Sequence, residues 1–222
     1  MNVTPTLRQL LINELPHGFV RSLIDKIPGI YKESYESVTN DPNLGEEQAK
    51  YVMGFYRRGA AETLLQRLSS EHGLKVNLIQ PENGGCKHVR VSIGRFGAVM
   101  CHVQTRAGFP SLSDNRVQAS SINELLSQST LFPIESSPKN EEIFAVFVHT
   151  EQTNKKDSFG SIHIGFPNHK FDSWIEEPID LMEILNEQEQ IIQSGDDRYG
   201  KSQDAEPRLK TDKINRKINE ES

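Results

Sequence analysis

The feature that most constrains the fold is the alternation of apolar and polar side chains over residues 87–106, KHVRVSIGRFGAVMCHVQTR. Along a β-strand, successive side chains point to opposite faces, so every second residue shares a face. Two apolar sets have this spacing, one on each side of a glycine-containing segment: Val89, Val91 and Ile93, then Val99, Cys101 and Val103. The pattern predicts a β-hairpin with one apolar face and one polar face.

Aligning the two apolar sets also predicts how the strands pair. It places Val91 opposite Val99 and leaves residues 94–96 as a three-residue loop with a glycine at its edge, a common hairpin connection. A slip of one residue would turn His102 against the core, so the expected register is well specified. In this register His88 lies directly opposite His102.

Length and composition indicate the class of protein. A chain of 222 residues usually forms one domain, and no apolar run approaches the roughly 18 residues that span a bilayer. The N-terminus has no positively charged leader followed by a long apolar stretch, so no secretion signal is expected. Cys86 and Cys101 lack a CxxC spacing and are expected to be free thiols. We therefore expect a soluble, cytoplasmic protein.

The first part of the chain, residues 1–73, has the periodicity of helices. Thr4 and Pro5 form a start signal for a first helix, and Pro28-Gly29 is expected to stop a second one. A third short helix is expected over 31–38, and the longest over 46–72. The sequence predicts a helical N-terminal region.

Residues 74–185 are expected to form a sheet core in one domain with the helical region. The predicted strands are 74–79, the two arms of the central hairpin, 143–148 and 161–166, with a helix over 117–127, a loop of about ten residues before 161 and a final helical segment after Trp174. The fold class is α+β, with a mostly antiparallel sheet built from two hairpins. Residues 186–222 are rich in charges of both signs and are expected to be a disordered or weakly helical tail.

A metal site is one hypothesis for the hairpin. His88 and His102 would be cross-strand neighbours, and His149 or His163 would supply a third ligand. However, no carboxylate or cysteine stands at a recognised ligand spacing, and the HExxH motif is absent. We therefore expect no metal and no cofactor.

A metal-dependent nuclease needs carboxylates on its strands to hold Mg²⁺. The predicted strands HVRVSI, AVMCHV, IFAVFV and SIHIGF contain no acidic residue, which argues against this class. A small metal-independent RNase or a nucleotide-directed toxin is the alternative that stays open, with His and Arg of the central hairpin at its site. In the RNase, His102 or His149 would be the general base. Arg90 or Arg106 would then stabilise the charge on the phosphorane.

Nucleophilic catalysis and nucleotide-binding loops find less support. Cys101 and His102 are adjacent on a strand, so their side chains point in opposite directions and cannot form a dyad. The segments GRFG and ENGG match neither a P-loop nor a dinucleotide fingerprint and are expected to be turns.

Binding is the function that these observations favour. The candidate surface consists of the following residues: His88, Arg90, His102, Gln104, Arg106, Arg116, His149 and His163. The expected partner is a protein, because a net charge of -6 does not indicate nucleic-acid binding, although a local basic patch stays open. We expect a bacterial or phage-type accessory protein that binds a macromolecule, in phage defence or a toxin–antitoxin-like system. Whether it is an enzyme, and its oligomeric state, are left open.

Overall fold

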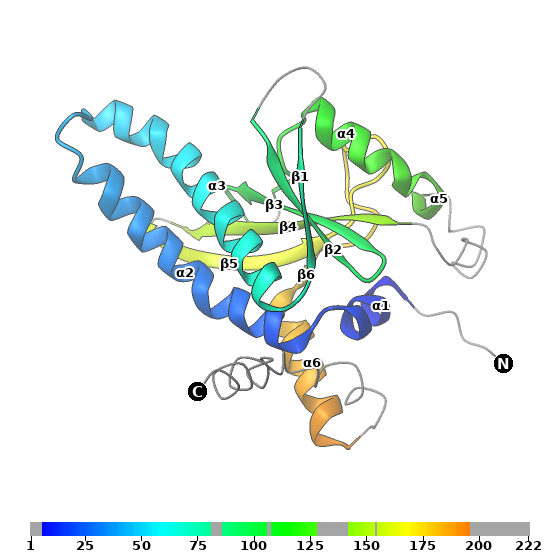
Figure 1. Ribbon diagram of the computed structural model, residues 1–222. Coiled ribbons are helices and arrows are strands. Elements are labelled where there is room, and N and C mark those ends of the chain that lie inside the picture. The colour runs from blue at the N-terminus through cyan, green and yellow to red at the C-terminus, as the bar shows by residue number, and fades with distance from the viewer. Residues whose placement is uncertain (1–5, 81–85, 106–107, 128–141, 154, 196–222) are drawn as a thin grey trace, which may run out of the picture. The chain divides into compact units, whose positions relative to one another are not determined.

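The computed structural model describes residues 6–80, 86–105, 108–127, 142–153 and 155–195 (Figure 1). The chain divides after Gln188 into two compact units, and the fold described below is that of the first. No helix in these ranges has the length and apolar character needed to cross a membrane.

Three helices begin the chain: α1 (Leu7–Glu14), α2 (His17–Thr39) and α3 (Glu46–Glu71). Thr6 and Gln9 form a reciprocal capping box at the start of α1. The predicted stop at Pro28-Gly29 is wrong, because Pro28 lies inside a continuous α2. Ile27, Ile30 and Tyr31 are all buried on the sheet side of this helix, and their burial outweighs the hydrogen bond that proline cannot make.

The sheet has six strands in sequential order, and the α+β, mostly antiparallel fold class is confirmed. The strands are β1 (Lys75–Ile79), β2 (His88–Ile93), β3 (Phe96–Val103), β4 (Ile143–Gln152), β5 (Lys155–Gly165) and β6 (Ile179–Asp180). All neighbouring strands pair antiparallel except β3 and β4, which are parallel and join the two hairpins.

The predicted register of the central hairpin is wrong by one residue. Val91 pairs with Ala98, and Ile93 pairs with Phe96, so the connection is the two-residue turn Gly94-Arg95. Gly94 has a φ of 54°, which suits the first central position of a tight hairpin turn. The physical reason is that β3 is buried on both faces, so apolar alternation along it does not single out one inner face.

Helices cover both faces of the sheet (Figure 1). Helix α2 packs on one face, where the rings of Phe19 and Phe147 lie 6.1 Å apart. On the other face, α4 (Asp114–Ser120) and the segment around Phe171 and Trp174 pack against a buried apolar cluster of β3 and β4. Consecutive residues of β3 therefore face two different layers, with His102 toward α2 and Cys101 toward α4.

Three further expectations differ from the structure. The helix predicted over 117–127 is broken into α4, a 3₁₀ turn (Ser121–Asn123) and α5 (Glu124–Ser127), because Asn123 turns inward to bind backbone groups. The predicted long loop before 161 is mostly strand, since β5 already begins at Lys155 and pairs with β4. The predicted tail boundary at 186 lies inside α6 (Leu181–Gln193), where Gln188 is fully buried; residues 196–222 lie outside the described residues.

Candidate functional site: two clefts

The first candidate site is a cleft of about 300 Å³ at the start of β2, which we name the α3–α4 cleft. Its lining comes from α3, the β2–β3 hairpin and α4, and includes Arg58, Glu62, Cys86, His88, Cys101, Ser111, Ser113, Asn115 and Arg116. His88 and Arg116, both predicted as binding residues, therefore lie in one cleft. Cys86 is exposed, Cys101 is buried, and both are free thiols.

The charges around His88 in this cleft are mainly positive. Burial lowers the pKa of His88; Glu62 opposes this, whereas the guanidinium groups of Arg58, Arg116 and Arg90 add to it. Arg58 pairs with Glu62 at 3.0 Å. Arg116 donates to the carbonyl and hydroxyl oxygens of Ser111. The cleft thus offers a cation to an incoming anionic group.

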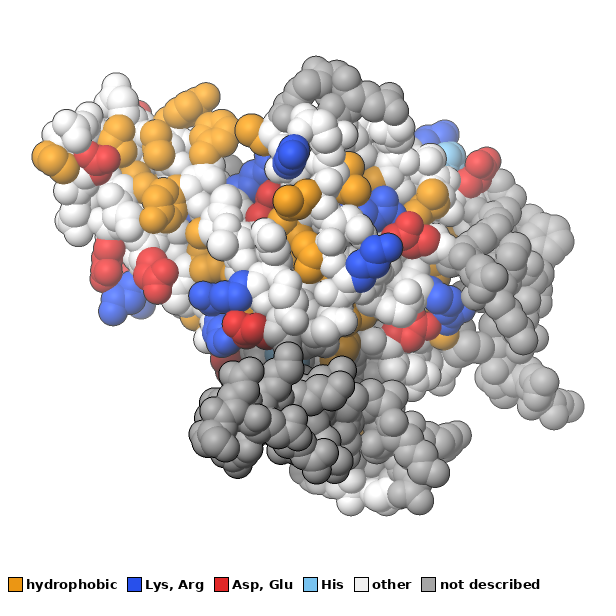
Figure 2. Space-filling view, viewed as in Figure 1, with side chains coloured by type: hydrophobic (Ala, Val, Ile, Leu, Met, Phe, Trp, Pro, Cys, Tyr) orange, Lys and Arg blue, Asp and Glu red, His pale blue; other side chains and the backbone are white. Residues whose placement is uncertain are grey.

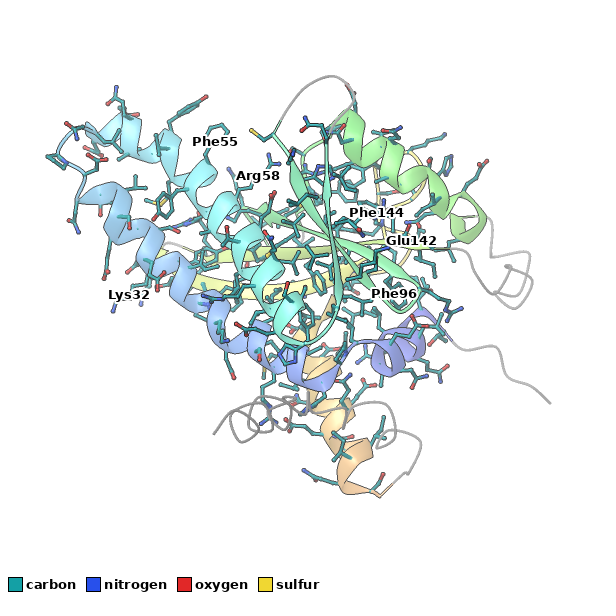
Figure 3. All side chains as sticks on the ribbon, viewed as in Figure 1. Lys32, Phe55, Arg58, Phe96, Glu142 and Phe144 are labelled. Atoms are coloured by element: carbon teal, nitrogen blue, oxygen red, sulfur yellow. The ribbon has the colours of Figure 1, made fainter. Side chains whose placement is uncertain are left out.

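Exposed apolar side chains flank the α3–α4 cleft on two sides. On α3, Phe55 lies one turn before Arg58 and is 63% exposed. Its ring centre lies 5.4 Å from that of Tyr51, which is 74% exposed. Figure 3 shows Phe55 pointing away from the sheet, and Figure 2 shows hydrophobic side chains gathered over this helix. Leu112 is 70% exposed and lies in the chain between Ser111 and Ser113, which both line the cleft.

The second candidate site is a cleft of about 530 Å³ on the other face of the sheet, which we name the α2–α3 cleft. Its lining comprises Tyr35, Thr39, Leu44, Glu46, Ala49, Lys50, Met53, Gly54, Arg57, His102, Gln104 and Glu151. His102 and Gln104 reach it from the end of β3, so two more predicted residues share a site.

A buried polar cluster lies beneath the α2–α3 cleft. The hydroxyl of Tyr31 forms a 2.7 Å hydrogen bond with Nδ1 of His149, and both side chains are almost completely buried. Burial raises the pKa of Tyr31. Burial, aided by His102 and Arg57, lowers the pKa of His149 to about 3. Both groups are therefore neutral at neutral pH.

Arg57 connects this cluster to the cleft. It is 2% exposed, its guanidinium lies 4.7 Å from the centre of the Tyr31 ring, and it forms a 2.7 Å ion pair with Glu151. A buried arginine needs such a partner, because an unpaired charge inside a protein is costly. The opposite charges of Arg57 and Glu151 balance, so the pair adds no net charge to the cleft.

His102 brings unused hydrogen-bonding capacity to the α2–α3 cleft. Its Nε2 atom is buried and has no hydrogen-bond partner among the described residues. Burial lowers the pKa of His102, so the ring is neutral at neutral pH and offers one donor and one acceptor. Its ring lies 5.4 Å from that of His149.

The predicted candidate surface is thus not one surface. Arg90 pairs with Glu142 at 2.9 Å and packs over Phe144, on the face opposite His102. His163 is buried against Ser161 on that same opposite face and does not converge with the hairpin histidines. Arg106 lies outside the described residues.

Sequence reasoning missed several residues of the two clefts. Arg57, Glu151 and Tyr35 line one of them, and Phe55 borders the other. The sequence offers one signal for Arg57: it is a charged residue within the apolar stripe of the long helix. A charged side chain in such a stripe is buried only when it is paired, so this position could have indicated a buried ion pair.

No metal centre emerges from these positions. Within the described residues, no three His, Cys, Asp or Glu side chains gather closely enough to hold a metal ion.

No protein-family model matches the chain, and a search of curated proteins finds no significant relative. Function therefore has to be argued from the two clefts themselves.

Proposed function

We propose that this protein acts by binding a protein partner, and that the α3–α4 cleft with its apolar flanks is the docking surface. One observation carries the proposal: the cleft that holds Arg116 is lined by Arg58 and Ser111, and the large apolar side chains of Phe55 and Leu112, close to them along the chain, are exposed. Aromatic residues and arginine are the side chains that most often carry binding energy in protein interfaces. Large exposed apolar side chains beside a cleft are typical of such surfaces.

The chemistry of the cleft specifies the partner. Arg116 favours a carboxylate, and the exposed apolar side chains near the cleft favour bulky apolar residues next to it in the partner. We therefore expect a segment in which an Asp or Glu stands between large apolar residues. The accessory role in phage defence or a toxin–antitoxin-like system, and a cytoplasmic location, stay predictions from the sequence.

A selection with a library of random dodecapeptides tests this proposal. We expect the full-length protein to enrich sequences with an acidic residue flanked by Leu, Ile, Phe or Trp. Phe55→Ala and Arg116→Gln should each weaken an enriched peptide about tenfold or more, the range for interface hot spots. Titration of a fluorescent copy of that peptide measures the change.

Lys32→Gln is the matched control, because Lys32 is an exposed cation on α2, away from the cleft (Figure 3). It should leave peptide affinity unchanged. Enrichment of basic peptides would contradict the proposal. So would a peptide affinity that neither Phe55→Ala nor Arg116→Gln changes. Concentration-dependent dimerisation that Phe55→Ala abolishes would instead assign the face to a second copy of this chain.

A metal-independent RNase is the second candidate, and one observation favours it: His102 shares a cleft with Arg57. Of the arginines expected from the sequence, Arg90 lies on the other face of the sheet, and Arg106 is outside the described residues. If this candidate holds, the protein will cleave total RNA in the presence of EDTA, and His102→Ala will abolish cleavage. Intact RNA after prolonged incubation with the folded protein excludes it.

A further inference from the structure

We propose that the α2–α3 cleft binds an uncharged nucleobase, held at its polar edge by His102 and Gln104. The inference goes beyond partner binding and is independent of it, because this cleft lies on the opposite face of the sheet from the α3–α4 cleft. It requires no catalytic step. Three properties of the cleft support it: its charge, its hydrogen-bonding groups and its walls.

The charges that line the cleft are already paired. Arg57 pairs with Glu151 at 2.7 Å, and Lys50 pairs with Glu46 at 2.9 Å. A charged ligand would lose hydration on entry and find no unopposed counter-charge among these groups. The site therefore favours a neutral ligand over an anion such as a free phosphate.

The hydrogen-bonding groups match a ligand that carries donors and acceptors side by side. The buried Nε2 of His102 has no partner among the described residues, and the Gln104 amide is exposed at the cleft. A neutral imidazole and a carboxamide together offer donors and acceptors over a short distance. The edge of a nucleobase presents such a pattern, and glutamine is a well-suited partner for it.

The walls suit a flat ring with apolar faces. Met53, Ala49 and Leu44 contribute apolar surface, and Tyr35 contributes an aromatic ring that is 38% exposed. Aromatic and thioether groups pack well against the faces of a base. The volume of about 530 Å³ lies within the range of small-molecule pockets.

Isothermal titration of the full-length protein with adenosine, guanosine, cytidine and uridine tests the inference. We expect one-to-one binding of at least one nucleoside and no detectable binding of ribose. The corresponding monophosphate should bind no more tightly than its nucleoside, because the cleft carries no net positive charge. Competition with single-stranded RNA then distinguishes two ligands. If RNA displaces the nucleoside, the cleft also binds a base within RNA; if it does not, the cleft binds only the free nucleoside, and both results support a base site.

Substitutions locate the binding. His102→Ala and Gln104→Leu should each weaken the nucleoside about tenfold or more, the effect of losing matched hydrogen bonds. Gln104 is exposed, so its substitution leaves the fold intact even if His102→Ala does not. Lys170→Gln is the control and should change nothing, because Lys170 is exposed and lines neither cleft.

Three results would overturn the inference. The first is the absence of heat from all four nucleosides at millimolar concentration. The second is nucleoside binding that Gln104→Leu leaves unchanged. The third is affinity that rises with phosphate charge, which would identify an anion site instead.

Discussion

Replacing Asn123 with alanine will lower the free energy of unfolding by about 3 kcal/mol or more. Asn123 is fully buried, and its side chain makes three hydrogen bonds to backbone groups. Its Nδ2 donates to the carbonyls of Phe144 and Pro167 at 2.9 and 2.8 Å, and its Oδ1 accepts from the amide of Phe144 at 2.9 Å. Alanine leaves these backbone groups buried without partners, and each such group costs roughly 1–3 kcal/mol.

Urea denaturation of the purified variant measures this loss. Ser121→Ala is the control, because Ser121 is exposed in the same 3₁₀ turn and should stay within about 0.5 kcal/mol of the wild type. If Asn123→Ala lowers the free energy of unfolding by less than about 1 kcal/mol, the hydrogen bonds of Asn123 do not stabilise the contact between the turn and β4.

The wild-type protein will lose stability as the pH falls from about 6.5 toward 3, and His149 will be one cause. The pKa of His149 is lowered from the usual 6.5 to about 3 in the folded protein, mainly by burial. Below pH 6.5 the unfolded chain binds a proton that the folded protein cannot yet bind. This contribution is therefore complete above pH 6.5 and is lost progressively on acidification, at up to about 1.4 kcal/mol per pH unit.

His149→Gln removes the titration while keeping a polar group beside the hydroxyl of Tyr31. Denaturation midpoints between about pH 7 and pH 4 should show a flatter dependence for this variant than for the wild type. The same substitution at His88, which is only half-buried, should flatten the curve less. Identical slopes for the wild type and His149→Gln would show that His149 binds its proton equally in both states.

Part of each cleft could be foreseen from the sequence. His102 and Gln104, like His88 and Arg116, were predicted as binding residues because polar side chains cluster on and just after the central hairpin. Their division between two clefts could not be foreseen, because the observed register, with Val91 opposite Ala98, places His88 and His102 on opposite faces of the sheet. The ion pair of Arg57 could not be predicted, because its partner Glu151 is far away in the sequence.

By itself, the sequence determined the helical N-terminal region, the α+β class and most of the strands, because periodicities of 3.6 and 2 are local properties of the chain. Only the tertiary structure decided the rest. Burial of β3 on both faces selected the pairing of Val91 with Ala98, and burial of Tyr31 carried α2 through Pro28. In both cases, segments distant in the sequence bury apolar surface, and this burial outweighed the structure that the local sequence favours. A local pattern contains no information on which distant segment will cover it.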